Sequence, residues 1–309
     1  MCPPYFSHDR KNLMHTIRRM SLIAALAFSA PASADNATVS FYFTHDAILQ
    51  QANGEALTAD AHKAATAQWF AQCLAGGEFA QFAGDFAPDP KMPIGERQAQ
   101  VAKFDNTAFE QIARAAWAKA NTALPQASLR ICVDLARQDD AFTRDRMDGI
   151  VAVTAGAGRI VLKIHPDADW ATSLPYTLAH EMHHSAWAQT QFDAAKPFTL
   201  ADYLVFEGRA DYFAGALFEH RAPWTTALDD AAHAAAWRDF SSKLDSADPA
   251  TLTAAMFGSP QAGIPMWAGY SVGYKLVSQR MARAPKLDFA AMTAAPATEF
   301  MPKTETTSR

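Results

Sequence analysis

Cysteine, glycine and charged residues are all scarce in this sequence. Three cysteines in 309 residues exclude the disulfide-dense scaffold of a small secreted domain. Fourteen glycines and 17 prolines exclude a fibrous or low-complexity chain, and a composition that is 50% hydrophobic and 19% charged excludes an intrinsically disordered one. A net charge of −5 argues against nucleic-acid binding, which requires clustered Lys and Arg. What is left is a globular, mildly acidic protein with a large core.

The first 34 residues have the three parts of a secretory signal peptide. Arg18 and Arg19 precede an apolar run of about ten residues, which ends in Pro31-Ala32-Ser33-Ala34, a small-x-small cleavage site. A membrane-spanning helix needs roughly 20 residues, and no later apolar run reaches that length. We therefore expect residues 1–34 to be cleaved as a bacterial signal peptide, and the mature chain to be periplasmic or secreted without a membrane span. The alternative, an ordinary buried helix, is disfavoured because nothing amphipathic flanks the run.

Two cysteines remain after this cleavage, Cys73 and Cys132. An even number of cysteines in an oxidising compartment makes a disulfide plausible. Two buried thiols that never meet are the alternative, and the sequence leaves both open.

The hydrophobic pattern changes its period along the chain. It alternates as in strands before Pro166 and repeats at helical spacing after Asp167. Strands are predicted over residues 37–44, 129–135, 149–154 and 159–165, and helices over 58–86, 107–122, 172–189, 199–219, 225–244 and 264–283. This order predicts an α+β architecture, with a small mixed sheet followed by a mainly helical C-terminal half.

An H-E-x-x-H motif, His180-Glu181-Met182-His183-His184, lies in one of the predicted helices. Residues four apart share a helix face, so His180 and His184 can point at one ion while Glu181 lies beside them. Neutral imidazoles bind zinc, and a catalytic zinc keeps a water molecule whose proton a neighbouring carboxylate can take. The motif arises by chance in roughly 1% of chains this long, so the alternative is a helix with surface histidines.

The next predicted helix supplies a third ligand. Glu207 completes a His-His-Glu set, which is one of the known catalytic zinc sites. Asp211, one turn later, can accept a hydrogen bond from the nitrogen of a zinc-bound histidine that faces away from the metal. The alternative is a solvated helix face on which Arg209 balances the charge. Both motifs together favour a zinc site.

These residues resemble the gluzincin metalloproteases, in which H-E-x-x-H is followed by Glu-x-x-x-Asp on a second helix. The chain is more similar still to an uncharacterised bacterial family of predicted zinc-dependent proteases, a domain-of-unknown-function family. Three stretches carry this likeness, residues 178–184, 206–213 and 265–274, within a region of roughly 130–285.

The resemblance implies a zincin-like metalloprotease fold over residues 126–290. It also implies that Glu181 is the general base and that the zinc ligands are His180, His184 and Glu207. Residues 35–125 carry no such likeness and are expected to form an N-terminal part of unknown role. Residues 291–309 are expected to be a C-terminal tail.

The strand before the metal helix, residues 158–165, has a further expected role. In zincins an edge strand in this position lies along the cleft and pairs with an extended substrate, which requires no particular side chains. The alternative is an internal strand with both edges occupied.

Two tyrosines on the predicted helix 264–283 are candidates for oxyanion stabilisation. Tyr270 and Tyr274 share a face with Trp267 and Val277, and such a stripe is often simply core. In the functional interpretation, the hydroxyl of Tyr270 or Tyr274 stabilises the oxyanion formed during hydrolysis.

Two other histidines are less promising. His220 is a weaker candidate for the same role. His183 lies about 100° around the helix from His184, so we expect it to pack or hydrogen-bond behind the site.

The sequence as a whole predicts an exported zinc metallopeptidase. It would hydrolyse a peptide or protein substrate with a zinc-activated water and Glu181 as general base. One alternative is a zincin-fold protein that binds zinc without peptidase activity, such as another amide hydrolase or a binding protein. The other is a metal-free envelope protein in which the motif is accidental.

Overall fold

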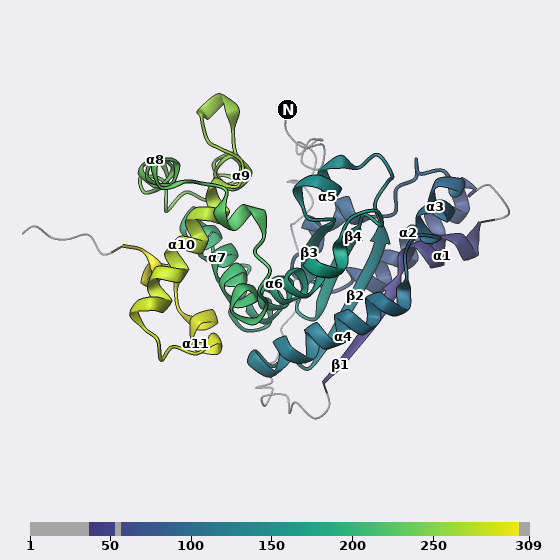
Figure 1. The fold of residues 1–309 in the computed structure, drawn as a ribbon, viewed down its shortest axis with the longest axis horizontal. Coiled ribbons are helices and arrows are strands. Elements are labelled where there is room, and N and C mark those ends of the chain that lie inside the picture. Colours follow the sequence, from purple (N-terminus) through teal and green to yellow (C-terminus); the bar gives the residue numbers. More distant parts are fainter. Residues whose placement is uncertain (1–36, 53–56, 303–309) are drawn as a thin grey trace, which may run out of the picture.

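A computed structural model describes residues 37–52 and 57–302 of the chain. The predicted signal peptide, residues 1–34, lies outside this part. Figure 1 shows a sheet with the N-terminal helices on one side of the molecule and a group of helices on the other, with helix α6 (Trp170–Gln191) between them. No helix within the described ranges combines the length and the hydropathy needed to cross a bilayer.

The sheet has four strands in the order β1-β2-β4-β3. Strands β1 (Thr38–Phe43), β2 (Ser128–Leu135) and β4 (Arg159–Ile164) are parallel to one another, and β3 (Ile150–Gly156) is antiparallel to β4. β3 and β4 form a hairpin whose turn contains Gly158, at φ +71°. The prediction of a small mixed sheet is confirmed.

The expectation that residues 158–165 form an edge strand is wrong. β4 pairs with β2 on one side and with β3 on the other, so both of its edges are occupied. The hairpin places β3 outermost because β2 already fills the far side of β4. β3 is therefore the edge strand next to α6.

Each face of the sheet is covered by helices. Alternate side chains of β2 and β4, such as Ile131 and Leu162, pack against α4 (Asn106–Ala123) and α6 in the main core. The opposite face packs against α2 (Ala59–Cys73), and a disulfide between Cys73 and Cys132 joins this helix to β2. The structure thus answers the question that the sequence left open for this cysteine pair.

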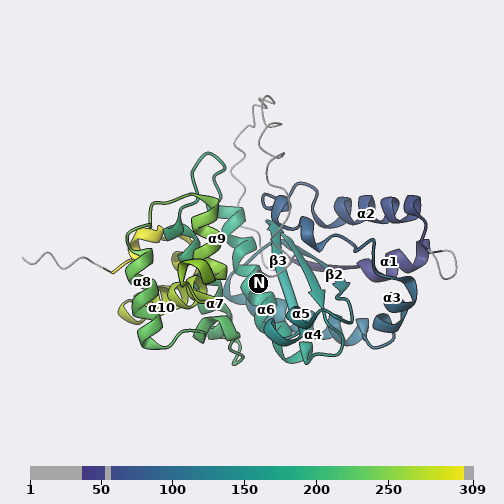
Figure 2. The same cartoon turned by 90° about the horizontal axis from the view of Figure 1, so that it is seen from above.

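Several short helices in the N-terminal part have too few turns to show a helical period in the sequence. They are α1 (Thr44–Gln51), α3 (Ile94–Val101) and α5 (Ala141–Arg146). The helical stretch expected over 58–86 ends instead at Cys73, is followed by Gly76 at φ +78°, and continues as two single 3-10 turns. Figure 2 shows α1, α2 and α3 grouped at the end of the sheet away from the helical half.

The C-terminal half is mainly helical, as predicted. After α6 come α7 (Leu200–Leu217), α8 (Asp230–Phe240), α9 (Pro249–Phe257), α10 (Ala268–Arg283) and α11 (Phe289–Ala294). The helix expected over 225–244 begins later, because Pro223 starts a separate 3-10 turn and Asp229 caps α8. The helix expected from 264 begins at Ala268, because Trp267 has the left-handed conformation, at φ +65°.

Residues 291–302, the described part of the expected C-terminal tail, are packed against the rest of the chain. Met292 in α11 and Phe300 in the following 3-10 turn are both buried in the main core. The guanidinium of Arg209 lies over the Phe300 ring, 4.6 Å from its centroid.

Helices α7 and α10 cross at two glycines. A Cβ atom at Gly273 would overlap the carbonyl oxygen of Leu204, and one at Gly208 would overlap the carbonyl oxygen of Gly273. The backbones of the two helices therefore touch one residue after Glu207.

Candidate metal centre

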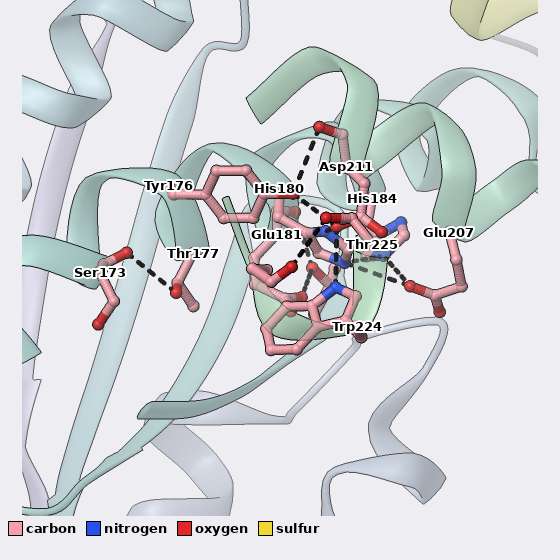
Figure 3. Close-up of polar contacts among 12 residues, drawn as sticks. Ser173, Tyr176, Thr177, His180, Glu181, His184, Glu207, Asp211, Trp224 and Thr225 are labelled. Atoms are coloured by element: carbon pink, nitrogen blue, oxygen red, sulfur yellow. Dashed lines mark hydrogen bonds and ion pairs between the residues drawn. The ribbon is translucent and has the colours of Figure 1, made fainter. Parts of the chain in front are cut away.

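Two helices position the residues of the candidate centre. α6 carries His180 and His184 one turn apart on one face. α7 begins with a capping box, in which the Thr199 hydroxyl accepts from the backbone of Asp202 and the Asp202 carboxylate accepts from the backbone of Thr199. This cap fixes where the helix starts. Figure 3 shows Glu207 of α7 directed toward the two imidazoles of α6.

The three donor atoms converge. The Nε2 atoms of His180 and His184 lie 3.0 Å apart, and the Glu207 Oε2 atom lies 3.2 Å from the first and 3.3 Å from the second. In a tetrahedral zinc site with bonds of about 2.0–2.2 Å, two ligand atoms lie about 3.3–3.6 Å apart. The spacing of this donor set is close to that of three corners of such a tetrahedron.

Asp211 determines how the ring of His180 is protonated. Its Oδ1 lies 2.8 Å from Nδ1 of His180, and an ionised carboxylate can only accept, so Nδ1 donates and Nε2 is the nitrogen left to face the centre. The same Oδ1 also accepts from the Tyr176 hydroxyl at 2.9 Å and from the Trp224 indole at 3.0 Å. Figure 3 shows these side chains around Asp211. This is the contact that orients a metal-binding histidine.

The charges fit a cation at the point of convergence. Burial alone lowers the pKa of His180, but the carboxylates of Asp211 and Glu207 outweigh it and hold the pKa well above its ordinary value. Burial alone raises the pKa of Glu207, but the two histidines outweigh it and lower the pKa to about 2. The same negative charge that favours a proton on His180 would favour a zinc ion in its place, with two imidazole nitrogens and an ionised carboxylate as its donors.

The alternative of a solvated helix face does not describe α7. Glu207 is 7% exposed and Asp211 is 0% exposed. Arg209 is directed away from them and donates to the backbone oxygens of Thr293 and Ala295, so it does not balance their charge.

Glu181 lies against the edge strand. It is 6% exposed, and the Thr154 hydroxyl of β3 lies 2.8 Å from its Oε2 and 2.8 Å from its backbone oxygen. The base candidate is thus held between α6 and the strand beside it.

The two candidate tyrosines lie in different surroundings. Burial, and then the negative charges of Glu207, Asp211 and Glu181, raise the pKa of Tyr270 well above its ordinary value. The hydroxyl of Tyr274 accepts instead from Arg221, at 3.4 Å, in an exposed position.

The two other histidines considered in the sequence, His183 and His220, lie away from the convergent donors. His183 is fully buried, and its Nε2 lies 3.2 Å from the Thr293 hydroxyl. His220 forms an ion pair with Asp148 at 3.2 Å.

Sequence reasoning missed several residues that touch the centre. Thr154, Tyr176 and Trp224 contact Glu181 or Asp211 as described above. Phe206 stacks on the His184 ring, with centroids 3.8 Å apart and planes at 11°. Tyr176 precedes His180 by one turn and could have been found from that spacing. Thr154 and Trp224 come from separate elements, and no pattern in the sequence marks them. Phe206 lies in the stretch 206–213 that carries the family likeness, but nothing there marks it as a contact of His184.

Comparisons with known proteins agree with this geometry. A family model described as "Predicted Zn-dependent protease" matches residues 109–302. The uncharacterized protein YjfC of Bacillus subtilis (strain 168) is 32% identical over 135 residues, which are 40% of this chain. The match spans 45% of the length of YjfC, which is less than half of that relative. No solved structure matches the chain significantly.

Proposed function

Because the chain belongs to the family of predicted Zn-dependent proteases, we propose that it is an exported zinc metallopeptidase with Glu181 as its general base. The single observation that carries this proposal is the convergence of His180, His184 and Glu207 donor atoms, all within 4.8 Å of one another. Glu181 follows the first ligand directly in the chain. The candidate ligands and the candidate base therefore lie next to one another on α6.

Each residue has a defined task in this proposal. His180, His184 and Glu207 would hold the zinc ion, which when bound supplies a Lewis acid that polarises the scissile carbonyl and acidifies water. Glu181 takes a proton from the attacking water as the water oxygen bonds to the carbonyl carbon. It then gives that proton to the amine as the carbon–nitrogen bond breaks, and so returns to the carboxylate form.

Tyr270 is the better of the two candidates for oxyanion stabilisation. The carboxylates of the centre raise the pKa of Tyr270, whereas the hydroxyl of Tyr274 accepts from Arg221. A phenol with a raised pKa stays protonated at neutral pH and can donate to the developing negative charge.

The substrate would pair with β3 rather than with β4. β3 is the outermost strand at its side of the sheet, and an extended peptide can add to such an edge through main-chain hydrogen bonds. The backbone N–H of Phe79 donates to Ala155 at 3.0 Å near the end of β3. At the other end of β3, the backbone N–H of Ile150 donates to Met147 at 3.0 Å. The stretch that remains for a substrate is therefore Val151–Thr154.

Export rests on two observations. The residue pattern before Asp35 is that of a signal peptide. The Cys73–Cys132 disulfide fits an oxidising compartment such as the bacterial periplasm.

The decisive variant is Glu181→Gln. It should keep the full zinc content, because Glu181 is not a ligand, and should lose peptide hydrolysis by about 100-fold or more, because an amide cannot take the proton. Zinc content and cleavage of a peptide panel are measured on the same preparations. Retained hydrolysis would overturn the mechanism. Full zinc with no cleavage by the wild-type protein would favour a zinc protein without peptidase activity.

A further inference from the structure

The Thr154–Glu181 contact has no role in the mechanism above. Thr154 is 3% exposed, and its hydroxyl lies 2.8 Å both from Oε2 and from the backbone oxygen of Glu181. Within residues 37–52 and 57–302, no other side chain hydrogen-bonds the Glu181 carboxylate.

The local structure aims the Thr154 side chain at α6. The pairing of β3 with β4 shifts register between Thr154 and Gly156, and such a bulge redirects the neighbouring side chain. One helical turn after Glu181, the Ser185 hydroxyl accepts from the backbone N–H of Gly158 at 2.8 Å. The same face of α6 therefore makes side-chain hydrogen bonds to the hairpin at two positions, Glu181 and Ser185. Of these, only the bond from Thr154 reaches the Glu181 carboxylate.

A threonine hydroxyl has one proton and two lone pairs, so it can serve a carboxyl group in both protonation states. It donates to Oε2 while Glu181 is ionised. Once Glu181 carries the proton on its other carboxyl oxygen, Oε2 is still an acceptor, and the threonine proton can stay on it while the new proton remains available for the amine. No proton has to leave Thr154 in either state.

We infer that Thr154 is a positioning residue, which holds the Glu181 carboxylate in one orientation both before and after it takes a proton. This inference rests on the proposed function. A glutamate side chain that is free to rotate loses rotamer entropy when it is ordered. An existing hydrogen bond removes that cost from the reaction step. The effect should therefore appear in kcat and leave KM nearly unchanged.

Three variants distinguish a role of Thr154 in positioning Glu181 from a role in stabilising the fold alone. Thr154→Val keeps the shape and removes the hydroxyl, Thr154→Ser keeps the hydroxyl, and Ser185→Ala breaks the other contact of α6 with the hairpin. On any peptide that the wild-type protein cleaves, Thr154→Val should lower kcat about 10- to 100-fold with unchanged zinc content and KM. Thr154→Ser should restore most of kcat, and Ser185→Ala should change it by less than about threefold. Wild-type kcat in Thr154→Val, an equal loss in Ser185→Ala, or no rescue by Thr154→Ser would overturn the inference.

A second readout does not depend on activity. The melting temperatures of zinc-loaded Thr154→Val, Glu181→Ala and the double variant form a cycle. The melting temperature of the double variant should fall by less than the sum of the two single decreases, because either change alone already breaks the hydrogen bond between Thr154 and Glu181. Additive decreases in melting temperature would show that Thr154 and Glu181 do not interact and would overturn the inference. If the wild-type protein cleaves no peptide, the proposed function fails, and this cycle still decides whether Thr154 holds the carboxylate.

Discussion

At the scale of single residues, the candidate centre depends on which atoms the surrounding residues leave free. Asp211 accepts a hydrogen bond from Nδ1 of His180, so that Nε2 of the same ring faces His184 and Glu207. Phe206 stacks on the His184 ring and fixes its plane. The geometry of the donors is therefore set by neighbours that bind no metal themselves.

Tyr270→Phe tests the role of the phenol at this centre. The change should lower kcat about 10- to 100-fold, because one oxyanion donor is lost, while zinc content stays the same. Steady-state kinetics on a cleaved peptide measure this. Tyr274→Phe, on the same helix, is the matched control, and its kcat should fall by less than about twofold. Equal losses in the two variants would contradict the assignment to Tyr270.

The candidate ligands could be picked out from the sequence because their spacing within each helix is local. His180 and His184 are one helical turn apart, as are Glu207 and Asp211, and the helical period alone puts each pair on one face. Thr154 and Trp224 could not be predicted in the same way. Their contacts depend on how separate elements pack, and a lone Thr or Trp has no spacing to interpret.

At the scale of elements, the order of the strands is the main correction. The sequence predicted strands over 149–154 and 159–165, but it held no information on which of the two pairs with β2. Packing decides this: β2 lies against β4, and β3 becomes the edge beside α6. The predicted helix bounds were also wrong where the backbone conformation of one residue ends the helix despite a helical hydrophobic pattern, as at Trp267 before α10.

The α7–α10 crossing holds two parts of the site at a fixed distance, since α7 carries Glu207 and α10 carries Tyr270. Gly273→Ala should destabilise the fold by about 1–3 kcal/mol, because its Cβ meets the backbone of Leu204 and the helices must move apart. Urea unfolding measures the loss. Gly95→Ala is the control: its Cβ meets nothing within 4 Å, and it should stabilise α3 by about 0.4–1 kcal/mol. Unchanged stability in Gly273→Ala would contradict the close crossing.

At the scale of the whole molecule, the Cys73–Cys132 disulfide joins helix α2 to strand β2 of the sheet. Cys73 and Cys132 are 59 residues apart, and the sequence could not pair them because nothing local brings α2 onto β2. The bond closes a long loop and acts mainly on the unfolded chain.

The double variant Cys73→Ser, Cys132→Ser should therefore lose about 3–4 kcal/mol of unfolding free energy. It should keep its zinc, because the disulfide lies on the face of the sheet that packs against α2 rather than against α6. Urea unfolding and metal analysis of the same preparation measure both. A loss below about 1 kcal/mol, or a loss of zinc as well, would contradict this account of the bond.

The most direct test of the central claim is the zinc content of the purified protein by elemental analysis, beside Glu207→Ala and the control Glu219→Ala. The account predicts about one zinc per chain in the wild-type protein and in Glu219→Ala. It predicts that Glu207→Ala loses most of it, because a His-His-Glu site is left with two ligands. A wild-type protein without zinc after refolding in its presence, or a Glu207→Ala variant that retains all of it, would contradict the metal centre and the peptidase that depends on it.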